Sequence, residues 1–256
     1  MDAIPVFEEP SPHVNHIPLD RPWVWLARGW NDLRQAGPLA LAYGAVLVVA
    51  SFIVTLALLY AGMIYLLLPM AAGFFLVGPV VAVGLYEIAR QHERGLPADP
   101  ADLIGAWRRN GTQIALLGLA LMMIHLFWVR LATLLFALFF HTGNPGWDGM
   151  IDAVFFSSVS LPFLIVGTLT GGVLAAVSFA ISAVSIPMLL DRDTNVFTAM
   201  ATSWTAVTVN WKPMALWAAL IVFFTGVGLV TFYIGLAVTV PLIALASWHA
   251  YRDLVR

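Results

Sequence analysis

Six long apolar runs alternate with shorter polar segments along most of this chain. The runs cover about residues 38–60, 66–89, 112–140, 161–190, 213–229 and 233–249. A helix needs roughly 20 apolar residues to cross the hydrocarbon layer of a bilayer, which is about 30 Å thick. The pattern therefore predicts an all-α, polytopic membrane bundle of six transmembrane helices, arranged as three hairpins.

A short amphipathic stretch with a tryptophan precedes each predicted hairpin. Trp30 comes before the first hairpin, Trp107 before the second and Trp204 before the third. Such stretches are typical of helices that lie in the membrane interface with tryptophan as an anchor. The chain thus reads as three repeated units, at about residues 22–90, 99–190 and 194–254. All three have the same orientation, unlike the inverted repeats of many secondary transporters.

The first 20 residues differ from the rest of the chain. They contain four prolines, four acids and no basic residue, and they lack an apolar run. This composition predicts a disordered or extended tail and not a signal peptide. His13 and His16 could both contact a metal, but two histidines in a proline-rich tail are more typical of solvated side chains. Residues 21–256 are expected to form a single six-span membrane domain.

Composition supports the membrane assignment and narrows the chemistry. Apolar residues make up 61% of the chain and charged residues 10%, with a mean hydropathy of +0.90. A soluble domain has roughly 45–50% apolar residues and about 25% charged residues. The net charge of −2 indicates no nucleic-acid partner. The chain has no cysteine, which excludes disulfides, thiolate nucleophiles and cysteine-ligated metals.

Basic residues fall on one side of the predicted membrane, with the exception of Arg130. By the positive-inside rule this side is cytoplasmic. Both termini lie on it, as an even number of spans requires. We therefore expect a multi-pass protein of a bacterial cytoplasmic (inner) membrane, with both termini in the cytoplasm.

His125 and Arg130 are ionisable residues inside the third apolar run. This run of about 29 residues would form a helix roughly 44 Å long, so it must tilt, protrude or break. An ionisable residue within a membrane is by default a functional hypothesis. Arg130, however, lies about 27 Å along the axis, where its long side chain reaches the opposite headgroups. For Arg130 the interfacial interpretation is preferred.

The fourth apolar run carries small residues at four-residue spacing. They are Gly167, Gly171 and Ala175, beside Gly172, Ala176 and Ala180. Such a face lets helix backbones approach each other closely. It is more typical of packing within a bundle than of a dimer seam or a pore.

Two stretches near predicted helix ends share one layout. Pro79–Arg90 and Pro241–Arg252 each begin with a proline, carry an aromatic residue seven positions later and end with an arginine. Ser185–Arg192 is a shorter copy. We expect these stretches to bring one cluster together at the cytoplasmic mouth of the bundle. Its members would be Tyr86, Glu87, Arg90, Asp191, Arg192, Trp248, His249 and Arg252.

Two roles are open for this cluster. Charged groups buried at an interface need partners, so pairs such as Glu87 with Arg252 or Asp191 with Arg90 would join hairpin to hairpin. A proton or ion path would use the same residues and remains the alternative.

No catalytic or cofactor site is recognisable. Haem would need one or two axial histidines, and the membrane-adjacent candidates are His125, His141 and His249. No two of them share a helix at a suitable spacing, so no haem or other cofactor is expected. The sequence also lacks H-E-x-x-H, G-x-S-x-G and a glycine-rich phosphate loop. We therefore expect a protein that is not an enzyme.

Three segments resemble a known family. They are residues 78–95, the segment from Asp191 through Ser203, Trp204, Asn210 and Trp217, and residues 241–254. They are similar to the bacterial predicted integral membrane proteins grouped as domain of unknown function number twenty-one eighty-nine, over most of the chain after Pro22. The family usually has Gly-His where this chain has Ala244-Leu245, so any role of that histidine is absent or reassigned here. The resemblance implies the architecture and little chemistry, although some members carry labels that connect them to terminal oxidases.

The sequence favours an accessory, scaffold or assembly subunit of a larger membrane complex, for example a respiratory one. Expected partners are the lipid bilayer and other membrane protein subunits. The alternative is a transporter or channel for a small solute, ion or lipid. A charged solute would need a polar cavity near the midplane, and the spans offer mainly mild hydroxyls there: Tyr43, Thr55, Ser178, Ser182 and Thr225. A lipid or apolar ligand would escape this objection.

Overall fold

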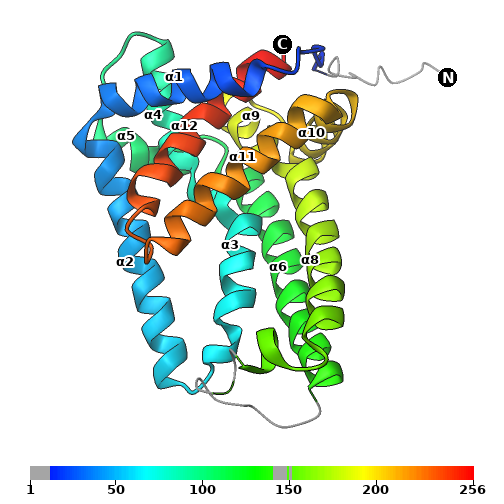
Figure 1. Cartoon of the computed structure of the whole chain (residues 1–256). Helices are drawn as coiled ribbons and strands as arrows, with labels where there is room; N and C mark the ends of the chain where they lie inside the picture. Colours follow the sequence, from blue (N-terminus) through cyan, green and yellow to red (C-terminus); the bar gives the residue numbers. More distant parts are fainter. Residues whose placement is uncertain (1–11, 141–148, 150–151) are drawn as a thin grey trace, which may run out of the picture.

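The computed structural model describes residues 12–140, 149 and 152–256 (Figure 1). Over these residues the fold is all-α, with one isolated β-bridge between Val14 and Val255. The helices are α1 (Arg21–Ala36), α2 (Pro38–Tyr60), α3 (Leu67–Val81), α4 (Val83–Glu93), α5 (Pro100–Gly105), α6 (Gly111–Phe139), α8 (Ser160–Ser182), α9 (Ser185–Asp191), α10 (Val196–Val209), α11 (Trp211–Val230) and α12 (Leu236–Leu254). Short turns of helix are η1 (Ile64–Leu66), η2 (Ala106–Arg108) and η3 (Asp152–Phe156).

Among the described residues, 4 helices are long and apolar enough to cross a membrane. They are α2, α6, the consecutive α8 and α9, and α11. The third apolar run is one continuous helix of 29 residues, so it does not break. The remaining two predicted spans take other forms: the second is divided into α3 and α4, and the sixth falls within α12.

The predicted span at residues 66–89 is interrupted at Ala82, which has φ −82° and ψ −2°. Pro79 lies inside α3, three residues before this break. A similar interruption separates α8 from α9. It lies four residues before Pro187, whose ring crowds the carbonyl of Ala183. In both places a long apolar run is divided into a membrane part and a short terminal helix.

The sixth apolar run starts later than predicted. Phe232 and Tyr233 have positive φ values of 52° and 68°, which a right-handed helix cannot include. The helix therefore begins at Leu236, and α11 and α12 are joined by a turn. This turn ends well short of the far ends of α2, α6 and α8 (Figure 1). Its tip contacts α2, where the Tyr233 hydroxyl lies 3.0 Å from Thr55 Oγ1.

The well-packed core lies at one end of the molecule, where both described termini are found (Figure 1). We call this layer the head; it consists of α1, α4, α5, α9, α10 and residues 244–254 of α12. Residues 83–91 and 185–190 are all buried. By contrast, α2 buries only Ala40 and Gly44. The other faces of α2 carry exposed apolar side chains, as expected of a helix surrounded by lipid.

Helix α1 lies across the head and packs along α12 (Figure 1). It buries Trp25 and Leu33 and exposes Trp23 and Trp30, which is the amphipathic pattern of an interface helix. Gly29 permits the close approach, because a Cβ there would lie 2.7 Å from the backbone nitrogen of Ala246.

The helices do not pair only with their chain neighbours. α2 packs mainly along α12, and α3 packs along α6 and α8. The α2–α12 contact depends on Gly44, where a Cβ would collide with the backbone carbonyl of Ala237. The first predicted hairpin is therefore open, and each of its arms packs on a later part of the chain.

We expect Gly44→Ala to lower the stability of the detergent-solubilised protein. The added methyl has no space against α12, and overpacking costs about 1–3 kcal/mol. Gly226→Ala is the matched control, because nothing lies within 4 Å of a Cβ at Gly226. Thermal unfolding followed by tryptophan fluorescence would measure both variants. An equal effect of the two would contradict the close contact of α2 and α12.

Candidate functional site

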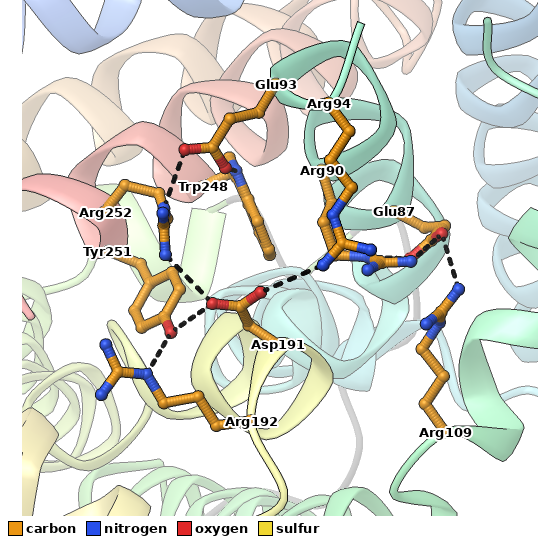
Figure 2. Close-up of polar contacts among 10 residues, drawn as sticks. All are labelled: Glu87, Arg90, Glu93, Arg94, Arg109, Asp191, Arg192, Trp248, Tyr251 and Arg252. Atoms are coloured by element: carbon orange, nitrogen blue, oxygen red, sulfur yellow. Dashed lines mark hydrogen bonds and ion pairs between the residues drawn. The ribbon is translucent and has the colours of Figure 1, made fainter. Parts of the chain in front are cut away.

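The candidate site is a network of charged side chains in the head, drawn in Figure 2. Helix α4 supplies Glu87 and Arg90, with Glu93 and Arg94 one turn further on. Asp191 ends α9, and Arg192 follows it. Trp248, Tyr251 and Arg252 come from the last two turns of α12. Three segments far apart in the sequence thus meet through side chains of opposite charge.

Glu87 is the most buried acid of the network, with 0% of its surface exposed. Arg90 binds it with two parallel hydrogen bonds, from Nε to Oε2 and from Nη2 to Oε1, both 2.7 Å long. Arg109, which follows η2, adds a 3.2 Å contact from Nη2 to Oε1. The predicted partner, Arg252, is not used. Residues three apart on one helix are neighbours, so Arg90 reaches Glu87 first.

Arg90 is itself almost fully buried, with 4% of its surface exposed. Its hydrogen bonds to Glu87 raise the pKa of Arg90 above its ordinary value. The two side chains are therefore paired with each other in a place that water barely reaches. Bidentate arginine–carboxylate pairs are among the strongest polar contacts in proteins.

Asp191 joins α9 to α12 and α4. Its Oδ2 accepts hydrogen bonds from the Tyr251 hydroxyl at 2.9 Å and from Arg252 Nη1 at 3.1 Å. Its Oδ1 lies 4.0 Å from Arg94 Nη2. The predicted Asp191–Arg90 ion pair is therefore replaced by contacts to Arg94 and Arg252. Burial, followed by the charge of Asp191, raises the pKa of Tyr251, so this hydroxyl remains a donor to the carboxylate.

Glu93 and Arg192 extend the network at its two edges (Figure 2). Glu93 accepts from the buried indole of Trp248 at 3.1 Å and from Arg252 Nε at 2.9 Å. Arg192 Nε donates to the Tyr251 hydroxyl at 3.0 Å. Of the predicted cluster, Tyr86 is the member that packs in the apolar core instead. Sequence reasoning missed Glu93, Arg94, Arg109 and Tyr251, although the first two lie just one turn after Arg90.

His249, the remaining predicted member, belongs to a second group beneath α1. Its Nε2 lies 2.6 Å from Asp32 Oδ2, and His92 Nδ1 lies 3.3 Å from Asp32 Oδ1. Asp32 is buried on the inner face of α1. No local pattern predicts this group, because its three members come from three different helices.

A half-buried carboxylate, Asp253, connects the N-terminal segment to the end of the chain. It accepts from Trp25 Nε1 at 2.8 Å and pairs with Arg21 at 3.0 Å. Residues 12–18 run alongside the C-terminus, where the backbone N–H of Asn15 donates to Leu254 O at 2.9 Å. The described part of the tail is thus extended and paired with the head.

The two ionisable residues of the third apolar run join neither group. Arg130 is exposed on α6, and His125 is half-buried with no hydrogen-bond partner for Nδ1 among the described residues. His141 lies outside the described residues. Within the part of the chain that the structure describes, no group of three or more histidines and acids could hold a metal ion.

An apolar groove of about 1000 Å³ lies away from the charged network. It is lined by α6, α8, α11 and the start of α3, with Trp128, Phe136, Phe163, Phe179, Trp211 and Ile221 among its walls. The small-residue face of α8 lines it too. Gly171 packs against Trp128, but nothing lies within 4 Å of a Cβ at Gly167 or Gly172. Packing within the bundle, the predicted role of this face, therefore holds for Gly171 and not for these two glycines.

Comparison with known proteins supports the resemblance. Residues 67–191 match the family model described as "Predicted integral membrane protein (DUF2189)". The matched part contains Glu87, Arg90 and Asp191 and ends before α12. Among curated proteins and among solved structures, nothing matches the chain.

We expect Glu87→Ala to destabilise the protein strongly. The change leaves Arg90 buried without its partner, and breaking a buried ion pair from one side costs about 3–5 kcal/mol. Glu93→Ala is the milder comparison on the same helix. Its ion pair with Arg252 is partly exposed, with side chains 38% and 40% accessible, and such pairs contribute about 0–1 kcal/mol; the lost hydrogen bond from the Trp248 indole adds about 1 kcal/mol. Thermal unfolding in detergent measures both. Unchanged stability of Glu87→Ala, together with lost function in cells, would favour an ion path.

Proposed function

We propose that this chain, whose residues 67–191 match the family model of predicted integral membrane proteins, is a non-enzymatic membrane protein that holds bilayer lipid in its apolar groove. In this proposal the first four apolar runs cross a bacterial inner membrane, and the fifth and sixth enter it from the head as the α11–α12 hairpin, whose turn stops short of the far ends of α2, α6 and α8 (Figure 1). The head and both termini face the cytoplasm, because most arginines lie there.

The observation that carries the proposal is the groove itself. Its walls include α6, α8 and α11, all of which are long and apolar enough to span a membrane. Along α8 it extends from Phe163 to Phe179, which is about 24 Å of helix. This length covers most of the roughly 30 Å hydrocarbon layer. Acyl chains are the molecules that surround such a surface.

The shape of the groove suits lipid. Its volume is about 1000 Å³, and its wall is open at Gly167 and Gly172, where nothing lies within 4 Å of a Cβ. Flexible acyl chains can fill a space of that volume and follow its irregular floor at Gly167 and Gly172.

The charged network supports a structural role for the head in this proposal. The carboxylates of Glu87 and Asp191 accept from several donors each. Paired groups of this kind hold helices in place. An ion path would need a carboxylate that can exchange its partner, followed by further polar groups along the spans.

An accessory or assembly role in a larger membrane complex is the second candidate. It is favoured by the short α11–α12 hairpin, whose tip residues Val230, Phe232 and Ile234 are exposed. A subunit that covered this tip should co-purify in gentle detergent and should be lost when Phe232 is replaced by Ala. Such a result, without bound lipid, would favour the accessory role over the lipid-holding one.

The lipid proposal predicts that filling the groove expels lipid. Gly172→Leu adds a side chain at a position that lines the groove and where nothing lies within 4 Å of a Cβ. Gly226→Leu is the matched control, because it adds the same bulk on α11 outside the groove. We expect native mass spectrometry of the full chain to show co-purified phospholipid on wild type and on the control, and at least severalfold less on Gly172→Leu. Equal lipid on all three would reject the proposal.

Topology can be tested separately. A reporter fused after Asp148, which lies outside the described residues, should read as periplasmic, and a reporter fused after Arg256 should read as cytoplasmic. A cytoplasmic result after Asp148 would overturn this arrangement while leaving the groove in place.

A further inference from the structure

The groove has a cation at its head-side end. Trp211, the first residue of α11, lines the groove, and the Lys212 ammonium lies 5.6 Å from the centre of the Trp211 ring. Lys212 is the only lysine in the chain. Both residues are exposed. The end of the groove nearest the head therefore presents an amphipathic ring and a positive charge together.

We propose that this end of the groove binds the anionic headgroup of a glycerophospholipid whose acyl chains lie in the groove. The inference rests on the proposed function and adds the class of headgroup. Tryptophan prefers the headgroup level of a bilayer. A lysine beside it supplies a compact, strongly hydrated charge. The phosphate of a phospholipid lies at the headgroup level beside the acyl chains, so it can contact both the tryptophan and the lysine.

Lys212 is available for such a ligand. Most other cations of the head are engaged by carboxylates: Arg90 and Arg109 by Glu87, and Arg94 and Arg252 by Asp191. No carboxylate forms an ion pair with Lys212 among the residues that the structure describes. Its charge is thus not balanced within the described part of the protein.

The geometry of α11 separates this site from the rest of the head. α11 packs on α12 and α1, and it runs obliquely away from α8 (Figure 1). The groove opens between them, and Trp211 stands where α11 begins. A lipid whose headgroup contacts Lys212 could therefore direct its chains between α8 and α11 toward Gly172 and Phe163, both of which line the groove.

The test is a competition between lipids of different charge. The full-length protein is purified in mild detergent, mixed with equimolar phosphatidylglycerol and phosphatidylcholine, and examined by native mass spectrometry. We expect wild type to retain the anionic lipid about fivefold more than the zwitterionic one, the ratio that a single basic residue near a headgroup contributes. Lys212→Gln should bring the ratio close to one, with total bound lipid unchanged. Lys212→Arg should restore the preference.

Arg34→Gln is the matched control. Arg34 also lies over a tryptophan, with its Cζ 5.6 Å from the Trp30 ring centre, but neither residue lines the groove. This variant should keep the wild-type ratio. If Lys212→Gln keeps the anionic preference, or if Arg34→Gln loses it equally, the headgroup inference is wrong even though lipid binds. If Gly172→Leu retains all its lipid, the proposed function itself fails.

Discussion

The architecture depends on the pairing of Glu87 at a position that water does not reach. A buried carboxylate is costly unless it is paired and hydrogen-bonded. Arg90 supplies the pair from the same helix, and Arg109 supplies a further contact from the segment that leads into α6. These contacts orient α4 against the start of α6. Glu93 and Asp191 continue the arrangement, because each binds Arg252 of α12. The head is thus built around acids on α4 and α9 that share arginines from their neighbours.

The contacts that hold α12 also determine where α11 lies in the membrane part of the molecule. α12 is held on one side by α1, through the close approach of Gly29 and Ala246, and by α2, through Gly44 and Ala237. The Tyr233–Thr55 contact holds the tip of the hairpin on α2 as well. α11 must follow α12, so it cannot close against α8. The groove results from this placement, and the glycines at 167 and 172 deepen it where larger side chains would have filled it.

Sequence reasoning succeeded where a feature depends on local pattern. The apolar runs, the amphipathic helix α1 and the meeting of α4, α9 and α12 at the head all follow from periodicity and from the repeated proline-to-arginine layout. It failed where several residues could be the partner of one charged group and only the three-dimensional arrangement decides between them. Arg90 binds Glu87 because it lies one turn away, whereas the repeat suggested a partner on another hairpin. Asp32 was not identified, since its histidine partners come from α4 and α12. The groove could not be predicted either, because a face of small residues looks the same in sequence whether a helix covers it or not.

The distribution of polar groups argues against a continuous path for ions through this molecule. The charged network is confined to the head, where its acids are already occupied by arginine, tryptophan and tyrosine donors (Figure 2). Along the membrane helices, the hydroxyls of Ser51, Thr133 and Thr170 donate to carbonyls one turn earlier in their own helices. Because these hydroxyls are hydrogen-bonded within their own helices, they are poor ligands for an ion crossing the membrane. The large open feature of the membrane half is apolar, so a hydrophobic ligand with a charged end matches the molecule better than a hydrated ion does.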